Sequence, residues 1–140
     1  RTVGELAYDE SLRALGGGAI PGFDFEYVRS VSRPTAADAG DPFLCQGRAN
    51  NLFRLVLGLP TREQELVEEA QAAALDQVAA ERAFARSTRP RLGANVDGAA
   101  LQARMPAGRT TVLTCGNSEG MEDIRRICGK AGFKFEMEEW

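Results

Sequence analysis

TTVLTCGNSEGMEDIRRICGKAGFKFEMEEW, residues 110–140, contains the signals of a strand, a helix and a second strand in immediate succession. Its first six residues form a β-branched run that is typical of a central strand. Residues 119–131 carry apolar side chains at helical spacing, with acidic residues early and basic residues late, as the helix dipole favours. Gly132 is expected to end this helix, and the alternation of apolar and charged residues over 133–140 indicates a final strand.

Toward the amino end, the chain repeats this alternation of helix and strand. Residues 23–31 alternate apolar and polar side chains, which is the period of a strand, and Pro34 is expected to stop it. The alanine- and glutamate-rich residues 61–87 favour one long helix that begins with a Thr61–Gln64 capping box. The other segments are predicted as short helices over 3–15 and 49–57, a loop over 34–47, and irregular chain over 87–109.

This order of elements predicts an α/β fold, with a mostly parallel sheet and helices on both of its faces. Ligands of such sheets bind beyond the carboxyl ends of the strands. The pairs Ser32-Arg33 and Cys115-Gly116 both lie at the carboxyl ends of predicted strands. We therefore expect the two pairs to face one crevice.

The composition limits the classes of function. The length of 140 residues suggests one domain, and the net charge of -3 argues against a general nucleic-acid-binding protein. No apolar run is long enough to span a membrane, and the three cysteines lack CxxC spacing, which favours reduced thiols in a cytoplasmic protein over a disulfide framework or a metal site. Because histidine is absent, Ser-His and Cys-His catalysis is excluded, and any catalysis is expected to use a bound cofactor.

VRSVSRPTAADAGDPFLCQGR, residues 28–48, holds two arginines at the two ends of one predicted loop. A guanidinium is a planar fork of donors that matches a phosphate in two-point fashion, and the hydroxyl of Ser32 adds a donor beside Arg33. The pattern therefore predicts a local phosphate site at Arg33 and Arg48. In the alternative interpretation both arginines are solvated or pair with Asp38 and Asp41 of the same loop.

The turn after residue 114 is a second candidate site. Gly116 permits close approach of a ligand, and the amino end of the following helix carries positive potential. Acidic residues crowd that end, so it favours a neutral or cationic group such as a nicotinamide; the alternative is a simple tight connection. Cys115 is either a strand-end thiol or a residue in contact with a redox ring, and Trp140 is either a terminal residue or a cover for a flat ring.

Together these segments resemble the carboxyl-terminal, NADP-binding domain of the ferredoxin–NADP reductase family in its bacterial form. The matching segments are RTVGELAY at 1–8, VRSVSRP at 28–34, the Gly-Arg pair at 47–48, TCGNSEGMEDIRR at 114–126 and the closing Trp140. The resemblance covers residues 1–57 and 110–140, and it leaves 59–109 as a helical and irregular insertion. The family's glycine-rich first turn and its FAD-binding barrel would precede Arg1, so residues 1–140 are interpreted as part of a longer reductase.

The resemblance implies that NADP(H) and FAD are the cofactors. It assigns the 2′-phosphate of NADP(H) to Ser32, Arg33 and Arg48. It places further cofactor contacts at Arg1, Thr2, Cys115, Gly116, Asn117 and Trp140, the last of these stacking on FAD. The turn is one residue longer than the family's CGNPxM pattern. Met121 keeps the methionine's role if the extra residue is a true insertion; otherwise Gly120 takes that place and Asp123 faces the cofactor.

The function implied is hydride transfer between NADPH and FAD, with single electrons passing to or from ferredoxin or flavodoxin. The FAD-binding domain of the same protein is then a partner of residues 1–140. One alternative is the reductase component of an oxygenase, or an NADH-preferring relative. An alternative of another class is a noncatalytic α/β interaction domain that docks a partner on the Leu66, Ala70 and Val78 face of the long helix.

Overall fold

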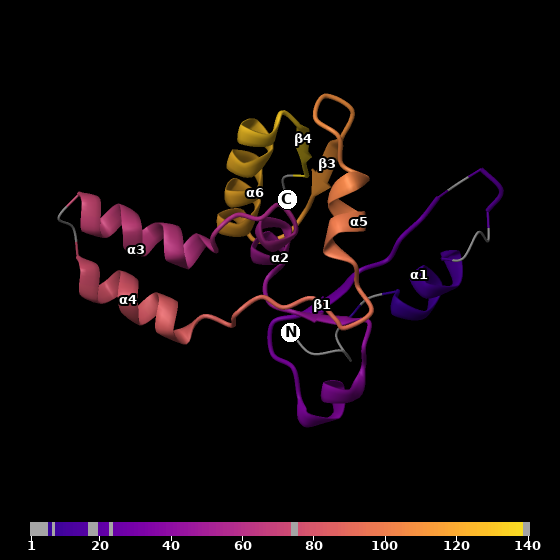
Figure 1. The fold of residues 1–140 in the computed structure, drawn as a ribbon, viewed down its shortest axis with the longest axis horizontal. Helices are drawn as coiled ribbons and strands as arrows, with labels where there is room; N and C mark the ends of the chain where they lie inside the picture. Colours follow the sequence, from indigo (N-terminus) through magenta and orange to yellow (C-terminus); the bar gives the residue numbers. More distant parts are fainter. Residues whose placement is uncertain (1–5, 7, 17–19, 23, 74–75, 139–140) are drawn as a thin grey trace.

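The computed structural model describes residues 6, 8–16, 20–22, 24–73 and 76–138. Over these residues the chain is a mixed α/β protein (Figure 1). Its α-helices are α1 (Asp9–Leu15), α2 (Ala49–Val56), α3 (Arg62–Ala72), α4 (Gln77–Arg86), α5 (Gly98–Ala103) and α6 (Ser118–Ala131). The other elements are the 3₁₀ helix η2 (Ala36–Gly40) and the strands β1 (Arg29–Val31), β2 (Leu44–Gln46), β3 (Thr111–Thr114) and β4 (Lys134–Met137).

The four described strands pair in parallel, as the sequence predicts, but they form two separate ladders. Strand β1 pairs with β2, and β3 pairs with β4, with Thr111 opposite Lys134. On the other side of β2, Gln46 makes an antiparallel bridge to Arg91 through hydrogen bonds of 2.8 and 2.9 Å. The described strands therefore do not join into the single sheet expected from the sequence, and the second edge of β2 pairs with Arg91 instead of another strand.

Several predicted boundaries are confirmed. Helix α2 and strands β3 and β4 lie where the sequence predicts them. The Thr61–Gln64 capping box is present, with Thr61 accepting a bond from the backbone of Gln64 and Gln64 accepting one in return. Gly132 ends α6 in the left-handed conformation, with φ of 72°.

Other predictions are wrong in ways that have local causes. The strand expected over 23–31 is regular only at Arg29–Val31, and the loop expected over 34–47 contains η2 and β2. The single long helix is two helices, because the side chain of Asp76 accepts a bond from the backbone of Ala79 and so begins α4 anew. The irregular segment contains α5, which Asp97 caps through Ala99 and Ala100.

The core lies between the two ladders and the helices α2 and α6. Its buried apolar side chains come from β1, β2, α2, α3 and α6, and they are Val31, Leu44, Cys45, Leu52, Ala70, Met121, Ile127 and Cys128. The rings of Phe53 and Phe133 also meet, with centroids 6.3 Å apart. Helices α3 and α4 form an antiparallel hairpin that projects to one side of this core (Figure 1). Among the described helices, none combines the length and apolar character needed to cross a membrane.

Candidate functional site

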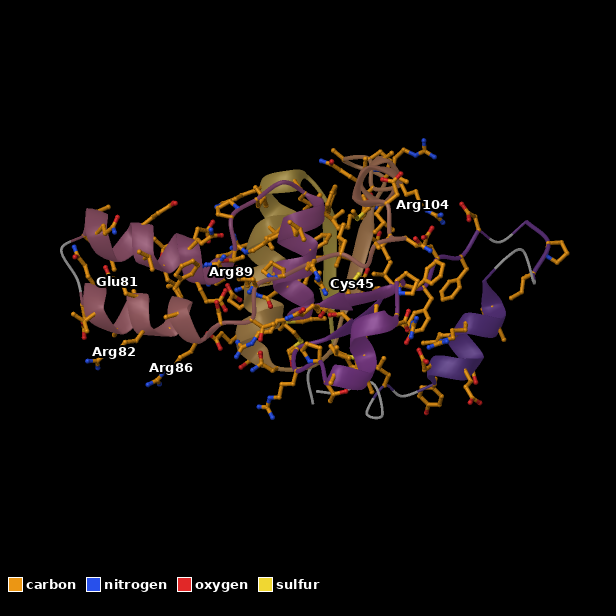
Figure 2. The ribbon with its side chains drawn as sticks, turned by 60° about the horizontal axis from the view of Figure 1, so that its bottom comes forward. Cys45, Glu81, Arg82, Arg86, Arg89 and Arg104 are labelled. Carbon is orange, nitrogen blue, oxygen red and sulfur yellow. The ribbon has the colours of Figure 1, made fainter. Side chains whose placement is uncertain are left out.

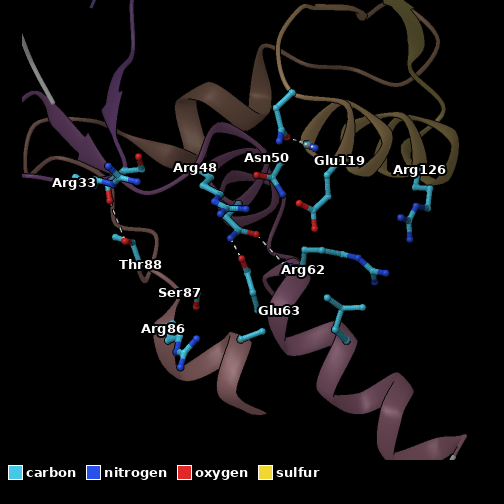
Figure 3. A pocket seen from close by; sticks show the side chains of 16 residues that line it. Arg33, Arg48, Asn50, Arg62, Glu63, Arg86, Ser87, Thr88, Glu119 and Arg126 are labelled. Atoms are coloured by element: carbon cyan, nitrogen blue, oxygen red, sulfur yellow. Dashed lines mark hydrogen bonds between the residues drawn. The ribbon is translucent and has the colours of Figure 1, made fainter. Parts of the chain in front are cut away.

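A pocket of about 550 Å³ lies where β1 ends and where α2, α3 and α6 begin (Figure 3). The end of α4 and the chain that follows it form another part of its wall. The pocket is lined by Ser32, Arg33, Arg48, Asn50, Asn51, Arg62, Glu63, Leu66, Ala83, Arg86, Ser87, Thr88, Asn117, Glu119, Gly120 and Arg126. Both arginines that the sequence singles out, and Asn117 from the predicted turn, therefore line one pocket.

Arg33 and Arg48 reach this pocket from the two ends of the β1–β2 connection. Arg33 follows β1 by two residues, and Arg48 is the N-cap residue of α2. Both are exposed, and neither side chain has an ion pair or hydrogen bond to another described residue. The two guanidinium groups are therefore available to a ligand in the pocket.

The acidic residues of the same loop have other partners. The Asp38 carboxylate accepts from the backbone N–H and the hydroxyl of Thr35, at 2.6 and 2.9 Å. The Asp41 carboxylate lies 2.8 Å from the buried Arg29 guanidinium. The backbone N–H of Phe43 and then Arg29 hold the pKa of Asp41 below its ordinary value. Of the alternative interpretation, the pairing of Arg33 and Arg48 with Asp38 and Asp41 is therefore wrong, whereas solvated arginines agree with their exposure.

The pocket gathers positive charge on an acidic chain. Five arginines and two glutamates line it, whereas the chain as a whole has a net charge of -3. Arg62 is already paired with Glu65 and Glu69, at 3.0 and 2.9 Å. Of the two glutamates, Glu63 accepts a 2.7 Å bond from the side chain of Asn51, whereas Glu119 is exposed. The positive charge of the other pocket arginines favours an anionic ligand.

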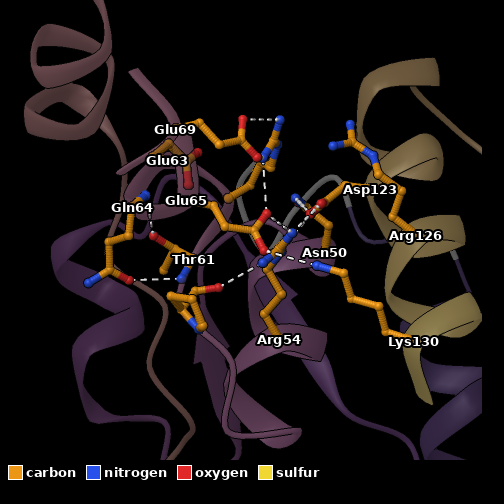
Figure 4. A network of polar contacts seen from close by, with 12 residues as sticks. Asn50, Arg54, Thr61, Glu63, Gln64, Glu65, Glu69, Asp123, Arg126 and Lys130 are labelled. Carbon is orange, nitrogen blue, oxygen red and sulfur yellow. Dashed lines mark hydrogen bonds and ion pairs between the residues drawn. The ribbon is translucent and has the colours of Figure 1, made fainter. Parts of the chain in front are cut away.

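A buried ionic network lies beside the pocket and joins α2, α3 and α6 (Figure 4). Arg54 of α2 contacts Asp123 of α6 in two-point fashion, with Nε–Oδ2 and Nη2–Oδ1 distances of 2.9 and 2.5 Å. Arg54 also donates to Glu65 at 2.7 Å and to the Pro60 carbonyl at 2.9 Å. The amide of Asn50 donates to Asp123 at 2.8 Å. Since Arg54 and Asp123 are 2% and 1% exposed, the network replaces water for both charges.

The network shifts the pKa values of its members. Hydrogen bonding to Arg54 lowers the pKa of Glu65 to about 2. Burial alone raises the pKa of Asp123, but the hydrogen bonds from Arg54 and Asn50 outweigh it and hold the pKa below its ordinary value. The Asp123 bond raises the pKa of Arg54 in turn. All three groups are thus charged near neutral pH, and they hold the last turn of α2 and the first turn of α3 against α6.

The other residues expected at the site lie elsewhere. Cys115 is exposed and lines a separate hollow between the carboxyl ends of β3 and β4, so it does not share the arginine pocket. Gly116 has a φ of 138° and forms the turn itself, and Met121 is buried in the core. The carboxylate of Asp123 faces Arg54 and Asn50 and has no open surface. Arg1, Thr2 and Trp140 lie outside the described residues.

The amide side chain of Asn117 has a structural role as well. It caps α6 by accepting a 2.9 Å bond from the backbone N–H of Gly120. The single crevice expected between Ser32-Arg33 and Cys115-Gly116 is not present, since the arginine pocket includes neither Cys115 nor Gly116 and reaches the chain after β3 only from Asn117 onward.

Several pocket residues are not singled out by the sequence reasoning, namely Asn50, Asn51, Arg62, Glu63, Arg86, Ser87, Thr88 and Arg126. Most of them come from the insertion, which the resemblance leaves unmatched. The partner-docking face expected on one long helix is split between two helices, with Ala70 buried and Val78 55% exposed. A signal for a break was present at Asp76, since aspartate is a preferred N-cap residue.

We compared the chain with protein-family models, curated proteins and solved structures, and none of the three comparisons gave a match.

Proposed function

We propose that residues 1–140 are the NADP(H)-binding part of a flavin-dependent ferredoxin– or flavodoxin–NADP oxidoreductase. The observation that carries the proposal is that two exposed arginines without partners among the described residues, Arg33 and Arg48, line one pocket with Asn117 of the turn after β3. The sequence resemblance assigns these same two arginines to the 2′-phosphate of NADP(H). The pocket volume of about 550 Å³ also lies within the range of small-molecule sites, roughly 300–1,000 Å³.

The residues of the pocket fit a phosphomonoester. Two guanidinium forks offer paired donors to the phosphate oxygens, and arginine keeps its charge at any physiological pH. The space beside Gly116 is open, since a Cβ there would meet nothing within 4 Å. Hydride transfer is chemistry that nicotinamide and flavin groups supply when bound, and the chain's own contribution is to bind and orient them.

The proposal extends to the partners of this domain. FAD is held mainly by another domain of the same protein, ferredoxin or flavodoxin is the electron partner, and the reaction takes place in the cytoplasm. A Rossmann-like sheet with helices on both faces remains part of the proposal, whereas the described strands by themselves form two separate parallel ladders. Cys115 lines a hollow separate from the arginine pocket, and in this proposal that hollow is on the side of the nicotinamide ring.

Nucleotide titration tests the proposal. Calorimetric titration with 2′,5′-ADP and with 5′-AMP compares ligands that differ in the 2′-phosphate. Arg33→Ala or Arg48→Ala should each lower the affinity for 2′,5′-ADP by about 10- to 150-fold, the equivalent of a lost charged hydrogen bond of 1.5–3 kcal/mol, and should barely affect 5′-AMP. Arg109→Ala is the control, because Arg109 is exposed and does not line the pocket. Equal losses for both ligands would contradict the 2′-phosphate assignment.

Glu119 favours a second candidate, an NADH-preferring reductase. Its carboxylate lines the pocket, is exposed, and makes no ion pair or hydrogen bond to the pocket arginines among the described residues, so it can accept bonds from a ribose diol. This candidate predicts that 5′-AMP binds at least as tightly as 2′,5′-ADP.

A further inference from the structure

We propose that the α3–α4 hairpin completes the phosphate pocket and that Arg86, at the end of α4, is its third phosphate-binding arginine. This inference rests on the proposed function and deepens it, because it gives the inserted segment a role in selecting the 2′-phosphate. Neither the sequence pattern nor the resemblance assigns a ligand to any residue of the insertion.

The first end of the hairpin is attached to the helix that carries Arg48. The side-chain oxygen of Asn51 accepts a 3.0 Å bond from the backbone N–H of Arg62, and its amide donates to Glu63 at 2.7 Å. Asn51 is 2% exposed, so these bonds are shielded from water. Together with the Arg54–Glu65 contact, they hold the first turn of α3 against α2.

The second end of the hairpin is attached to the strand that precedes Arg33. The hydroxyl of Thr88 donates a 3.0 Å bond to the carbonyl of Ser32. Farther along, the chain passes close to Gly47, where a Cβ would lie 3.0 Å from the Cα of Pro90, and then pairs with β2 at Arg91. Both ends of the hairpin are therefore fixed to the segments that carry the two predicted phosphate ligands.

This double attachment brings the last turn of α4 to the pocket. Figure 3 shows the chain running from Arg86 through Ser87 and Thr88 toward Arg33, with Arg48 on the neighbouring wall. Arg86 is exposed and has no ion pair or hydrogen bond to another described residue, whereas Arg62 at the other end of the hairpin is neutralised by Glu65 and Glu69. The hairpin thus brings to the pocket one guanidinium without an ion pair, that of Arg86, together with the Glu63 carboxylate, which accepts from the Asn51 amide.

Three uncompensated guanidinium groups around one pocket repel one another until an anion enters. A phosphomonoester carries a charge of about -1.5 to -2 at neutral pH and has three terminal oxygens, so it can engage more than two arginines. 5′-AMP carries its phosphomonoester at the 5′ position and has none at the 2′ position, so its adenosine bound in the same way gains little from the third arginine. Arg86 should therefore strengthen binding of the 2′-phosphate specifically.

The test compares two arginines on the same helix. Arg82 and Arg86 are both exposed residues of α4 (Figure 2), but of the two only Arg86 lines the pocket. Arg86→Ala should weaken 2′,5′-ADP binding by roughly three- to tenfold, the range for a partly exposed charge-assisted contact, and should leave 5′-AMP binding unchanged. Arg82→Ala should change neither affinity by more than about twofold. Arg86→Lys, which keeps the charge, should retain most of the affinity that Arg86→Ala loses.

The possible outcomes separate the inference from the proposed function. If Arg33→Ala weakens 2′,5′-ADP binding while Arg86→Ala behaves like Arg82→Ala, the hairpin inference is overturned and the proposed function stands. If the unmodified protein does not prefer 2′,5′-ADP to 5′-AMP, both are overturned. A purely structural role for Arg86 as a cation at the end of α4 would lower the urea midpoint and weaken both ligands alike, and that result also overturns the inference.

Discussion

Arg48 and Arg54 lie on the same short helix and have opposite surroundings. Arg48, at the N-cap of α2, is exposed and has no side-chain partner among the described residues. Arg54, in the last turn, is 2% exposed and makes four side-chain hydrogen bonds (Figure 4). The same residue type thus serves the core in one place and faces an open pocket in the other.

The difference shows that a buried guanidinium of this chain is paired with carboxylates, whereas an exposed one is not. A guanidinium removed from water must be paired, because an unpaired buried charge costs several kcal/mol. Arg54 meets that condition through Asp123 and Glu65, which come from two other helices. Arg48 and Arg33 remain hydrated, so they can exchange water for a phosphate without breaking an existing ion pair. The buried network therefore holds the helices in place, and the pocket arginines are left for a ligand.

The comparison is tested most strongly by replacing Arg54 and Arg48 in turn. Arg54→Met should lower the free energy of unfolding by about 3–5 kcal/mol, because it leaves Asp123 as a buried charge without its main partner. Arg48→Met should lower it by less than about 0.5 kcal/mol, as expected for an exposed residue without contacts. Urea unfolding followed by circular dichroism measures both. Similar losses for the two variants would show that the pocket arginines also hold the fold together.

Acid should weaken the network without requiring any substitution. The pKa of Glu65 is about 2 in the folded chain and 4.5 ordinarily, so its stabilising effect is complete above pH 4.5 and is lost as the pH falls toward 2. Asp123 acts in the same direction, since its pKa is also lowered. Over this range the unmodified protein should lose about 1–3 kcal/mol more stability than Glu65→Gln, the scale of a hydrogen bond to a charged group. Parallel pH curves for the two proteins would show that Glu65 contributes nothing to stability.

A smaller effect on ligand affinity is expected from the Glu119 carboxylate. Glu119 lines the pocket with an exposed carboxylate that repels an anionic ligand. Glu119→Gln should therefore tighten 2′,5′-ADP binding by about two- to fivefold, a gain of 0.3–1 kcal/mol that shrinks in high salt. Glu81→Gln is the control, because Glu81 is exposed, does not line the pocket and has no ion pair to another described residue. A loss of affinity in Glu119→Gln would instead support the NADH-preferring candidate.

The sequence predicts the pocket arginines better than it predicts the network. Arg33 and Arg48 are recognisable because they flank one loop directly after a strand and before a helix, and that placement depends on local signals. The Arg54–Asp123 contact joins residues 69 positions apart, and it exists only because α2 packs on α6. No local pattern marks either residue as buried, since both occur in segments of mixed polarity.

The remaining wrong predictions of secondary structure also arise because local sequence signals do not report contacts between distant segments. Helix propensity is high on both sides of Ala73, so it does not reveal that Asp76 begins a second helix and turns α4 back along α3. That reversal is what brings Arg86 to the pocket. Likewise, the strand pattern predicts parallel pairing correctly, but whether two ladders join depends on contacts between segments distant in the chain.

The most direct test of the account observes the arginine side chains themselves. In ¹⁵N-labelled protein, the Nε–Hε signals of Arg33, Arg48 and Arg54 can be assigned by substitution and followed by NMR during titration with 2′,5′-ADP. The account predicts saturable shifts for Arg33 and Arg48, no comparable shift for Arg54, and much weaker changes with 5′-AMP. Unchanged Arg33 and Arg48 signals at saturating 2′,5′-ADP would contradict it.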